Sequence, residues 1–310
     1  MTNEIERLRI GLIGATGRWG PSAHIPAIQH LPETELYAVC TAHEETAQAA
    51  SEKYSVELFY HDDKVMSENP QIEAVLVAVR VPAHFELTKN AIEAGKHVFC
   101  EWPLGANLKE AEALASLARE RKIHTMVGLQ RRASPVYLKL QELVGEGYVG
   151  EVLSVNLQQL GGGVLSRTSD RSWQKDAELG ANTLTIGFGH AIDALCMIVG
   201  EIVEVSGLVM TQVPQWYETD TEQLVDVTSR RREQESTRFG FDVDIGIACR
   251  VIGTCPWQPV SEAGANTVLV QDRPHHRTRE TQGGLNVEIE GGEPRRQQVT
   301  VLVHTGIRRG

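Results

Sequence analysis

The stretch Leu8-Arg-Ile-Gly-Leu-Ile-Gly14-Ala-Thr-Gly17-Arg-Trp-Gly20 decides the fold of the first half of this 310-residue chain. Its first six residues are mostly apolar and predict a buried β-strand, and three glycines follow at G-x-x-G-x-x-G spacing. Residues 23–31 then predict a helix. Glycines between a strand and a helix let backbone N–H groups meet a pyrophosphate with no side chain in the way. The stretch therefore predicts a nucleotide-binding loop.

Strands and helices alternate through the residues that follow this loop. The run at 74–79 is wholly apolar, as expected for a strand of a parallel sheet that is covered on both faces. Asn107 and Glu110 have capping-box spacing at the start of a helix over 108–118. The other predicted strands cover residues 36–40, 97–101 and 123–129, and the other predicted helices cover 44–54 and 83–94. This alternation predicts a Rossmann-type, doubly wound parallel sheet over residues 1–128 and hence an α/β fold.

The pattern changes after residue 128, and we assign residues 129–310 to a second, α+β domain. A helix is predicted over 135–145, a strand over 151–160 and an apolar helix over 180–199. A Gly-Gly-Gly turn at 161–163 and a β-branched strand at 202–213 lie between and after them. A helix followed by strands fits a domain built on a separate sheet.

The last stretch of the chain differs in composition. Residues 229–310 contain twelve Arg and no Lys, whereas residues 1–228 contain ten Arg and eight Lys. Helical periodicity also ends there. Two interpretations stay open: a divergent set of strands, such as 267–271 and 299–303, or a reading frame that shifts near Thr228. The second would disrupt the C-terminal domain and any oligomer formed through it.

The overall composition argues against several classes of function. A formal net charge of −11 disfavours direct nucleic-acid binding, because a phosphate backbone attracts a basic face. The five cysteines show no C-x-x-C spacing and there is no His-Glu-x-x-His pattern, so we predict buried thiols and no metal site. No window approaches the ~18 consecutive apolar residues of a membrane helix, and the first residues lack a signal-peptide pattern. We expect a soluble, cytoplasmic protein with no membrane partner.

The residue at the end of the second strand bears on the choice between NAD and NADP. In NAD-binding domains a carboxylate about 20 residues after the glycines accepts hydrogen bonds from the ribose. This position is Thr41 here, followed by Ala42 and His43. A hydroxyl, with a cation at His43 or Arg18, would tolerate the 2′-phosphate of NADP. The sequence therefore predicts NAD or NADP and leaves the choice open.

Five motifs beyond the loop resemble the Gfo/Idh/MocA family of sugar and polyol oxidoreductases. They are Val77-Ala-Val-Arg-Val-Pro-Ala-His84, Ala94-Gly-Lys-His-Val-Phe-Cys-Glu-Trp-Pro103, Met126-Val-Gly-Leu-Gln-Arg-Arg132, Gly147-Tyr-Val-Gly-Glu-Val-Leu-Ser-Val155 and Phe188-Gly-His-Ala-Ile-Asp193. The resemblance extends over residues 7–228. It implies an N-terminal Rossmann domain and a C-terminal domain with an open, mainly antiparallel sheet, through which family members often oligomerise.

The sequence departs from the family at one catalytic motif. Where the family has Glu-Lys-Pro, with a lysine that assists proton transfer, this chain has Glu101-Trp102-Pro103. Tryptophan has only an indole N–H donor and cannot act as a general acid or base near neutral pH. Its ring either lies beside the nicotinamide or packs between the domains. Together with the other motifs, Glu-Trp-Pro is similar to the branch that contains the fungal repressor of the galactose regulon, which keeps the fold and the dinucleotide site but works as a protein-binding sensor.

The second catalytic element implied by the resemblance is an Asp-x-Gly-x-His pattern on a helix. His190 is present and Asp193 follows one turn later, but the earlier aspartate position is Ile186. His190 is either a base or sugar hydrogen-bond donor, or a structural helix histidine. Lys175 is either a substitute for the missing amine or a solvated loop lysine. The candidate catalytic residues are therefore His190, Asp193 and Lys175.

We expect the dinucleotide to contact the glycine loop and the motifs at the strand ends. The candidate cofactor-binding residues are Gly14, Thr16, Gly17, Arg18, Trp19, Thr41, His43, Val79, His84, Glu101, Trp102 and Gln130. Two functions stay open. One is an NAD(P)-dependent oxidoreductase of a sugar- or polyol-like secondary alcohol that lacks the usual lysine, and the other is a non-catalytic, dinucleotide-binding regulator. The expected partners are a carbohydrate-like small molecule and either a second copy of the chain or a regulatory protein.

Overall fold

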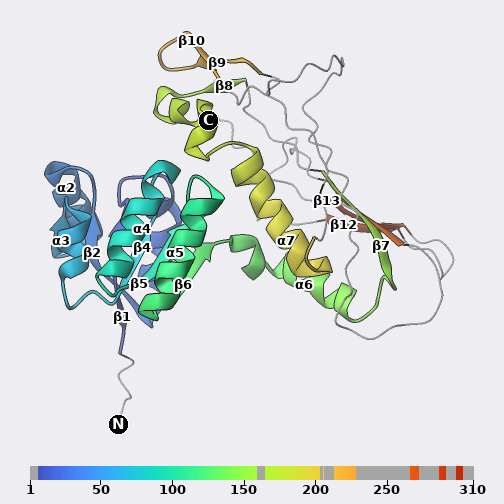
Figure 1. The fold of residues 1–310 in the computed structure, drawn as a ribbon, viewed down its shortest axis with the longest axis horizontal. Coiled ribbons are helices and arrows are strands. Elements are labelled where there is room, and N and C mark those ends of the chain that lie inside the picture. The colour runs from blue at the N-terminus through green and yellow to red at the C-terminus, as the bar shows by residue number, and fades with distance from the viewer. Residues whose placement is uncertain are drawn as a thin grey trace. The chain divides into compact units, whose positions relative to one another are not determined.

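The computed structural model of this chain describes residues 6–158, 165–202, 205 and 213–227, together with three strands within 266–302. The chain divides into two compact units. The N-terminal unit comprises Met1–Leu129 with Glu178–Ala181, and the C-terminal unit comprises Gln130–Ala177 with Asn182–Gly310. Figure 1 shows the elements of both units, and each unit is described below by itself.

The N-terminal unit is built on one six-stranded sheet in which all strand pairs are parallel. Its strands are β1 (Leu8–Ile13), β2 (Thr34–Cys40), β3 (Leu58–Tyr60), β4 (Ala74–Val77), β5 (His97–Glu101) and β6 (Thr125–Gly128). Their order is β3-β2-β1-β4-β5-β6, so the chain reverses its progress across the sheet between β1 and β4. Such a reversal opens a crevice at the carboxyl ends of the strands, where doubly wound sheets bind ligands. The predicted Rossmann architecture is confirmed.

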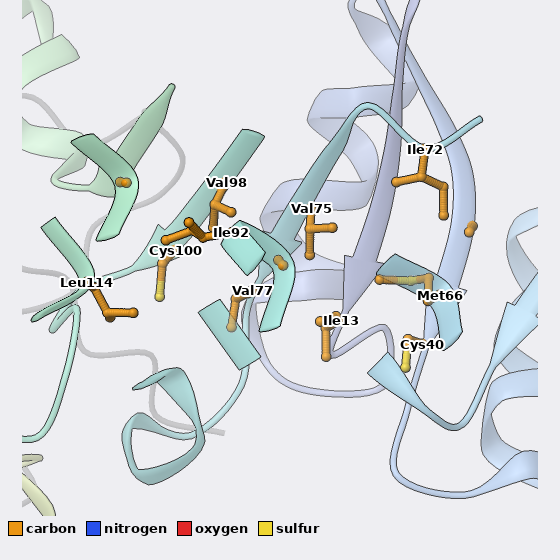
Figure 2. Close-up of a cluster of buried hydrophobic side chains, with 13 residues drawn as sticks. Ile13, Cys40, Met66, Ile72, Val75, Val77, Ile92, Val98, Cys100 and Leu114 are labelled. Carbon is orange, nitrogen blue, oxygen red and sulfur yellow. The ribbon is translucent and has the colours of Figure 1, made fainter. Parts of the chain in front are cut away.

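Helices cover both faces of this sheet. Met66, Ile92 and Leu114 are buried in one hydrophobic cluster with strand residues such as Val75 and Val77, as Figure 2 shows. They belong to α3 (Asp63–Glu68), α4 (His84–Glu93) and α5 (Leu108–Arg121). The alternate strand residues form a second cluster with α1 (Ile25–His30) and α2 (Glu44–Tyr54). Because successive strand residues point to opposite faces, the apolar run of β4 supplies both clusters.

The helix after the glycine loop begins earlier than the sequence predicts and changes its hydrogen bonding on the way. It starts as a π-helical turn, η1 (Gly20–His24), and continues as α1. The N–H of Ile25 donates to the carbonyl of Gly20, five residues back. Pro26 has no N–H and its ring crowds the carbonyl four residues before it, which favours the wider turn at this point.

The capping box predicted before α5 is present. The Asn107 side chain accepts a hydrogen bond from the N–H of Glu110 at 3.1 Å. The Glu110 carboxylate reaches back and accepts from the N–H of Ala106 at 2.8 Å. Both N–H groups lie at the start of a helix and have no partner within it, so this pair of side chains fixes where α5 begins.

The C-terminal unit places two helices side by side, α6 (Pro135–Gly145) and α7 (Gly189–Val199), as Figure 1 shows. Tyr137 and Leu140 of α6 are buried together with Val149 and with Ala194 of α7. η3 (Gln130–Ala133) precedes α6, and η4 (Ser169–Lys175) and the π-helical η6 (Leu184–Phe188) lie between α6 and α7 in the sequence. Of η5 (Ala177–Leu179), only Ala177 is assigned to this unit. The predicted turn at 161–163 and most of the predicted strand at 202–213 lie outside the described residues.

The described strands of this unit form two sheets. One has the order β10-β9-β8, and the other has the order β12-β13-β11-β7. The strands are β7 (Val152–Gln158), β8 (Ser166–Arg167), β9 (Gln215–Glu218), β10 (Gln223–Asp226), β11 (Asn266–Gln271), β12 (Asn286–Glu290) and β13 (Gln298–Leu302). β11 is parallel to both β7 and β13, and β12 is antiparallel to β13, so the larger sheet is mixed rather than mainly antiparallel. Parallel neighbours need long crossovers, and more than a hundred residues separate β7 from β11.

One helical stretch among the described residues, Ala177–Val199, is long and apolar enough to cross a membrane by length and composition. Only its last 11 residues form a continuous α-helix, α7, whereas a spanning helix needs about 20 residues. The stretch also contains Asp193, which is ion-paired with Arg132. This stretch is therefore weak evidence for a membrane-spanning segment. The absence of a membrane partner stays a prediction.

Candidate functional site

The glycines of the loop after β1 fall into two groups. Gly14 has a φ of +104°, its N–H donates to the Cys40 carbonyl at 2.9 Å, and a Cβ there would lie 2.3 Å from the Ala78 carbonyl oxygen. A Cβ on Gly20 would lie 2.3 Å from the Gly14 carbonyl oxygen. A Cβ on Gly17 would keep 3.3 Å from its nearest atoms. Gly14 and Gly20 are therefore required by the fold itself, whereas Gly17 is free to serve a ligand.

The tip of the loop is open to solvent. Thr16, Gly17, Arg18 and Trp19 are exposed, while the residues on either side of them are buried. The Arg18 guanidinium lies over the Trp19 ring, 5.2 Å from its centroid. An exposed loop with a bare glycine, at the carboxyl end of β1 and ahead of a helix, suits the pyrophosphate of a dinucleotide. The predicted phosphate-binding residues thus fit the group that they are expected to hold.

Thr41, at the end of β2, is turned into the protein. It is buried, and its hydroxyl donates to the His43 carbonyl at 2.9 Å and lies 2.6 Å from the Thr46 hydroxyl. This network shapes the turn before α2. The His43 side chain is exposed beside it. No carboxylate occupies the position that would bind an adenosine ribose, as the sequence predicts.

His84 holds two loops together, and its role as a cofactor-binding residue stays a prediction. Its side chain is only 1% exposed. Nδ1 lies 2.6 Å from the Pro103 carbonyl oxygen, and Nε2 lies 3.1 Å from the Val79 carbonyl oxygen. His84 positions the loop after β4 and the loop after β5, both at the carboxyl edge of the sheet.

The burial of His84 links its charge to stability. Burial lowers its pKa, although the two carbonyl oxygens and the Glu101 charge act in the opposite direction. The unfolded chain therefore binds more protons than the folded protein below the ordinary histidine value of about 6.5. We expect the free energy of unfolding to decrease as the pH falls from about 6.5 toward the lowered pKa. Urea unfolding between pH 5 and 8 measures this slope, and His84→Gln should flatten it.

The exposed residue His61 supplies the matched control for this experiment. His61→Gln removes an imidazole without touching the two loops, so it should retain the wild-type slope. His84→Gln should also lower stability by roughly 1–3 kcal/mol, because the amide cannot reproduce both the packing of the buried ring and its hydrogen bond to a carbonyl in the same geometry. Equal slopes in the wild type and His84→Gln would show that His84 does not contribute to the pH dependence.

Glu101 meets a residue that the sequence analysis missed. His24 Nε2 lies 2.6 Å from Glu101 Oε1, and the imidazole packs edge-on against Phe99 with ring centroids 5.2 Å apart. The side chains of His24 and Glu101 are 15% and 8% exposed. The nearest sequence signal is a histidine four residues after Gly20, in the first turns of the phosphate-binding helix. Trp102, the next residue after Glu101, is half-buried.

The candidate catalytic residues all lie in the C-terminal unit. Asp193 accepts from Arg132 Nε at 3.0 Å to each oxygen and from Nη2 at 2.6 Å. This bidentate pair ties η3 to α7, so the Asp193 carboxylate is engaged as an anchor. His190 is half-buried in the first turn of α7, directly after the π-helical η6. Gln130 is exposed and opens η3.

Lys175 is half-buried at the end of η4, near Glu218. Hydrogen bonds from the hydroxyls of Ser172 and Thr221 hold the pKa of Glu218 below its usual value, and the Lys175 charge adds to this effect. Lys175 is therefore close to a carboxylate within its own unit.

Two of the three described cysteines are buried, as the sequence predicts, and Cys196 is half-buried. Cys40 and Cys100 are buried and unpaired, and burial raises the pKa of each to about 12, so both are neutral and inert. Cys249 and Cys255 lie outside the described residues. No group of three metal-ligating side chains occurs in the described part of the chain.

Comparison with known proteins gives two family matches, which cover different parts of the chain. Residues 8–129 match the GFO_IDH_MocA model, an oxidoreductase family with an NAD-binding Rossmann fold. Residues 135–239 match the C-terminal domain of Gal80p. The first match confirms the predicted family resemblance and an NAD-type cofactor. The second confirms the similarity to the branch of the galactose repressor.

Individual relatives divide between enzymes and regulators. Dehydrogenase aclE of Aspergillus oryzae is 37% identical over 206 residues, which is 63% of this chain and 56% of that protein. The galactose/lactose metabolism regulatory protein GAL80 of Kluyveromyces lactis is 27% identical over 242 residues, which is 73% of this chain and 52% of that protein. The chain thus spans about half the length of these curated relatives. A solved structure of levoglucosan dehydrogenase with NADH and levoglucosan matches 72% of this chain and 61% of that one, with 26% identity and a TM-score of 0.64.

Proposed function

We propose that this chain, whose N-terminal domain belongs to the Gfo/Idh/MocA oxidoreductase family, is an NAD-dependent dehydrogenase of a carbohydrate-like secondary alcohol. The observation that carries the proposal is the glycine loop at the switch point of the sheet. There Gly14 and Gly20 are fixed by packing, and Gly17 is left bare at an exposed tip. The 37% identity to a protein named as a dehydrogenase supports turnover rather than binding alone. The structure of levoglucosan dehydrogenase with its sugar supports the class of substrate.

The chain's own residues divide the work of such a reaction. When bound, the dinucleotide supplies the nicotinamide carbon that takes up the hydride of the alcohol. Gly17 and its exposed neighbours would hold the pyrophosphate, and His84 fixes the two loops at the ends of β4 and β5. His190 is the imidazole that accepts the alcohol proton as the carbonyl forms. Asp193 keeps α7, and with it His190, in place through its ion pair with Arg132.

A second function is a dinucleotide-binding regulator without turnover. The observation that favours it is the match of residues 135–239 to the C-terminal domain of Gal80p, joined with tryptophan at position 102 in place of lysine. Both functions need the same glycine loop, so dinucleotide binding alone does not separate them. Turnover separates them, because only the dehydrogenase converts a substrate.

The deciding experiment measures binding and turnover on the same protein. Dinucleotide affinity is taken from quenching of tryptophan fluorescence, and turnover from absorbance at 340 nm with NAD⁺ and a panel of sugars and polyols. We expect NADH formation with at least one member of the panel, and a loss of about 10²-fold or more in His190→Ala, as is usual when a general base is removed. Binding without any turnover across the panel would favour the regulator.

The cell compartment and the partners follow from this proposal. A dehydrogenase of a sugar-like metabolite with an NAD cofactor would act in the cytoplasm. Its small-molecule partner would be the carbohydrate-like alcohol, and its protein partner a second copy of the chain. For the regulator, the partner would instead be another protein.

A further inference from the structure

The carboxylate of Glu101 interacts with two imidazoles. His24, from the phosphate-binding helix, lies 2.6 Å away. His84, from α4, experiences the Glu101 charge, which favours its protonated form, while burial lowers its pKa. The adjacent Cys100 thiol stays neutral, because burial raises its pKa to about 12. The net charge of this cluster, defined as Glu101, His24 and His84, therefore depends on the protonation of the imidazoles.

Packing holds the carboxylate where it is. A Cβ added to Gly128 of β6 would lie 3.0 Å from Cδ and from both oxygens of Glu101, so the carboxylate rests directly over this glycine. On the other side, the His24 ring is wedged against Phe99. Phe99 and Glu101 are two residues apart on β5 and therefore point to the same face. Three elements thus fix one charge at the carboxyl end of β5.

The topology places this charge under one half of the dinucleotide. The glycine loop lies at the end of β1, and the ribose position at Thr41 follows β2, so the adenosine half belongs over β1, β2 and β3. The other half crosses the switch point to β4, β5 and β6. Glu101 ends β5 and Gly128 ends β6. The nicotinamide half of a bound cofactor would therefore lie on the side of the sheet that carries the Glu101 cluster.

We propose that the Glu101 cluster sets the preference of this site for oxidised over reduced dinucleotide, and that a proton on His24 weakens that preference. The nicotinamide ring of NAD⁺ carries a positive charge that NADH lacks, while the two pyrophosphates are identical. A pair made of carboxylate and neutral imidazole has a charge of −1 and attracts the oxidised ring. The same pair is neutral once His24 is protonated. Imidazoles in general change their charge between about pH 5 and 8, so this is the pH range to test.

This inference rests on the dinucleotide binding of the proposed function but not on turnover, so its test uses affinities alone. The dissociation constants of NAD⁺ and NADH are measured by tryptophan quenching at pH 6 and pH 8, at constant ionic strength. The ratio of the two constants cancels effects that are common to both ligands. We expect the ratio of the NAD⁺ constant to the NADH constant to rise about tenfold as the pH falls from 8 to 6, equivalent to 1.4 kcal/mol.

Variants of the cluster identify the group that carries the proton. The amide of His24→Gln can still donate to Glu101 but takes up no proton. The ratio of the NAD⁺ constant to the NADH constant in this variant should therefore be the same at pH 6 as at pH 8. Glu101→Gln should raise the ratio about tenfold at pH 8, because the attraction for the oxidised ring is gone. His30→Gln changes an exposed histidine of the same helix and should behave as the wild type. Circular dichroism checks that each variant is folded. If Glu101→Gln does not fold, the pH dependence of His24→Gln alone tests the role of the cluster.

The outcomes separate the two proposals. The role of the cluster would be overturned if the ratio of the NAD⁺ and NADH constants did not change with pH in the wild type. It would also be overturned if this ratio changed with pH in His24→Gln as much as in the wild type. Both outcomes would leave dinucleotide binding intact. Failure to bind either NAD⁺ or NADH would instead overturn the proposed function. A pH dependence that is present in the wild type and His30→Gln but absent in His24→Gln supports the inference.

Discussion

Trp102→Lys is expected to raise turnover by about 10²–10⁴-fold, the usual contribution of a well-placed general acid or base. The family resemblance implies a lysine at this position that assists proton transfer, and the indole of Trp102 cannot replace it. The new ammonium would follow Glu101 directly at the carboxyl end of β5, where its charge is compensated by the carboxylate. As the ammonium it would donate a proton when a ketone is reduced by NADH, and as the neutral amine it would accept the proton when the alcohol is oxidised. Absorbance at 340 nm in both directions measures the effect.

A matched variant separates the amine from the loss of the large ring. Trp102→Leu removes the indole without adding a titratable group, so it should not raise turnover. A similar gain in both variants would mean that relief of crowding, rather than proton transfer, limits the native protein. If the native chain has no turnover and Trp102→Lys gains it, the regulator becomes the better description of the native chain. The dinucleotide affinity of each variant, measured separately, shows whether the effect lies in binding.

Gly14→Ala is expected to destabilise the N-terminal unit by about 3–5 kcal/mol. A positive φ in a residue with a Cβ costs roughly 1–3 kcal/mol, and overpacking typically adds another 1–3 kcal/mol. Both apply, since φ is +104° and the Cβ would lie 2.3 Å from the Ala78 carbonyl oxygen. This is a large part of the 5–15 kcal/mol that ordinarily separates folded from unfolded domains. Urea unfolding followed by circular dichroism gives the value directly.

Gly17→Ala should weaken dinucleotide binding strongly but change the stability of the N-terminal unit only slightly, unlike Gly14→Ala. Its Cβ would meet only two carbonyl oxygens at 3.3 Å, and the residue is exposed, so a change within about 1 kcal/mol is expected. The added methyl group would stand where the pyrophosphate approaches the backbone, and dinucleotide affinity should fall about tenfold or more. An unchanged affinity in folded Gly17→Ala would show that the loop does not hold the pyrophosphate in the way we propose.

The sequence alone predicts the features that depend on residues within a few positions of one another. The glycine spacing from Gly14 to Gly20 identifies the loop, the apolar run at 74–77 identifies a covered strand, and Asn107 with Glu110 identifies a helix start. These signals are local, because a strand, a tight turn and a cap are set by neighbouring side chains and backbone angles. They were sufficient for the Rossmann architecture and for the nucleotide-binding loop.

Only the tertiary structure decided how the strand ends come together and what each polar residue does there. His24 and Glu101 are 77 positions apart and meet because the helix that follows β1 reaches the carboxyl end of β5. Asp193 looks like a catalytic residue in sequence, yet Arg132, 61 positions away, occupies its carboxylate. His84 looks like a ligand-binding residue, yet two carbonyls enclose its ring. The identity of a side chain limits its chemistry. Its partners, its burial and therefore its charge depend on which strands become neighbours in the sheet. The residues next to it in the sequence do not show which strands these are.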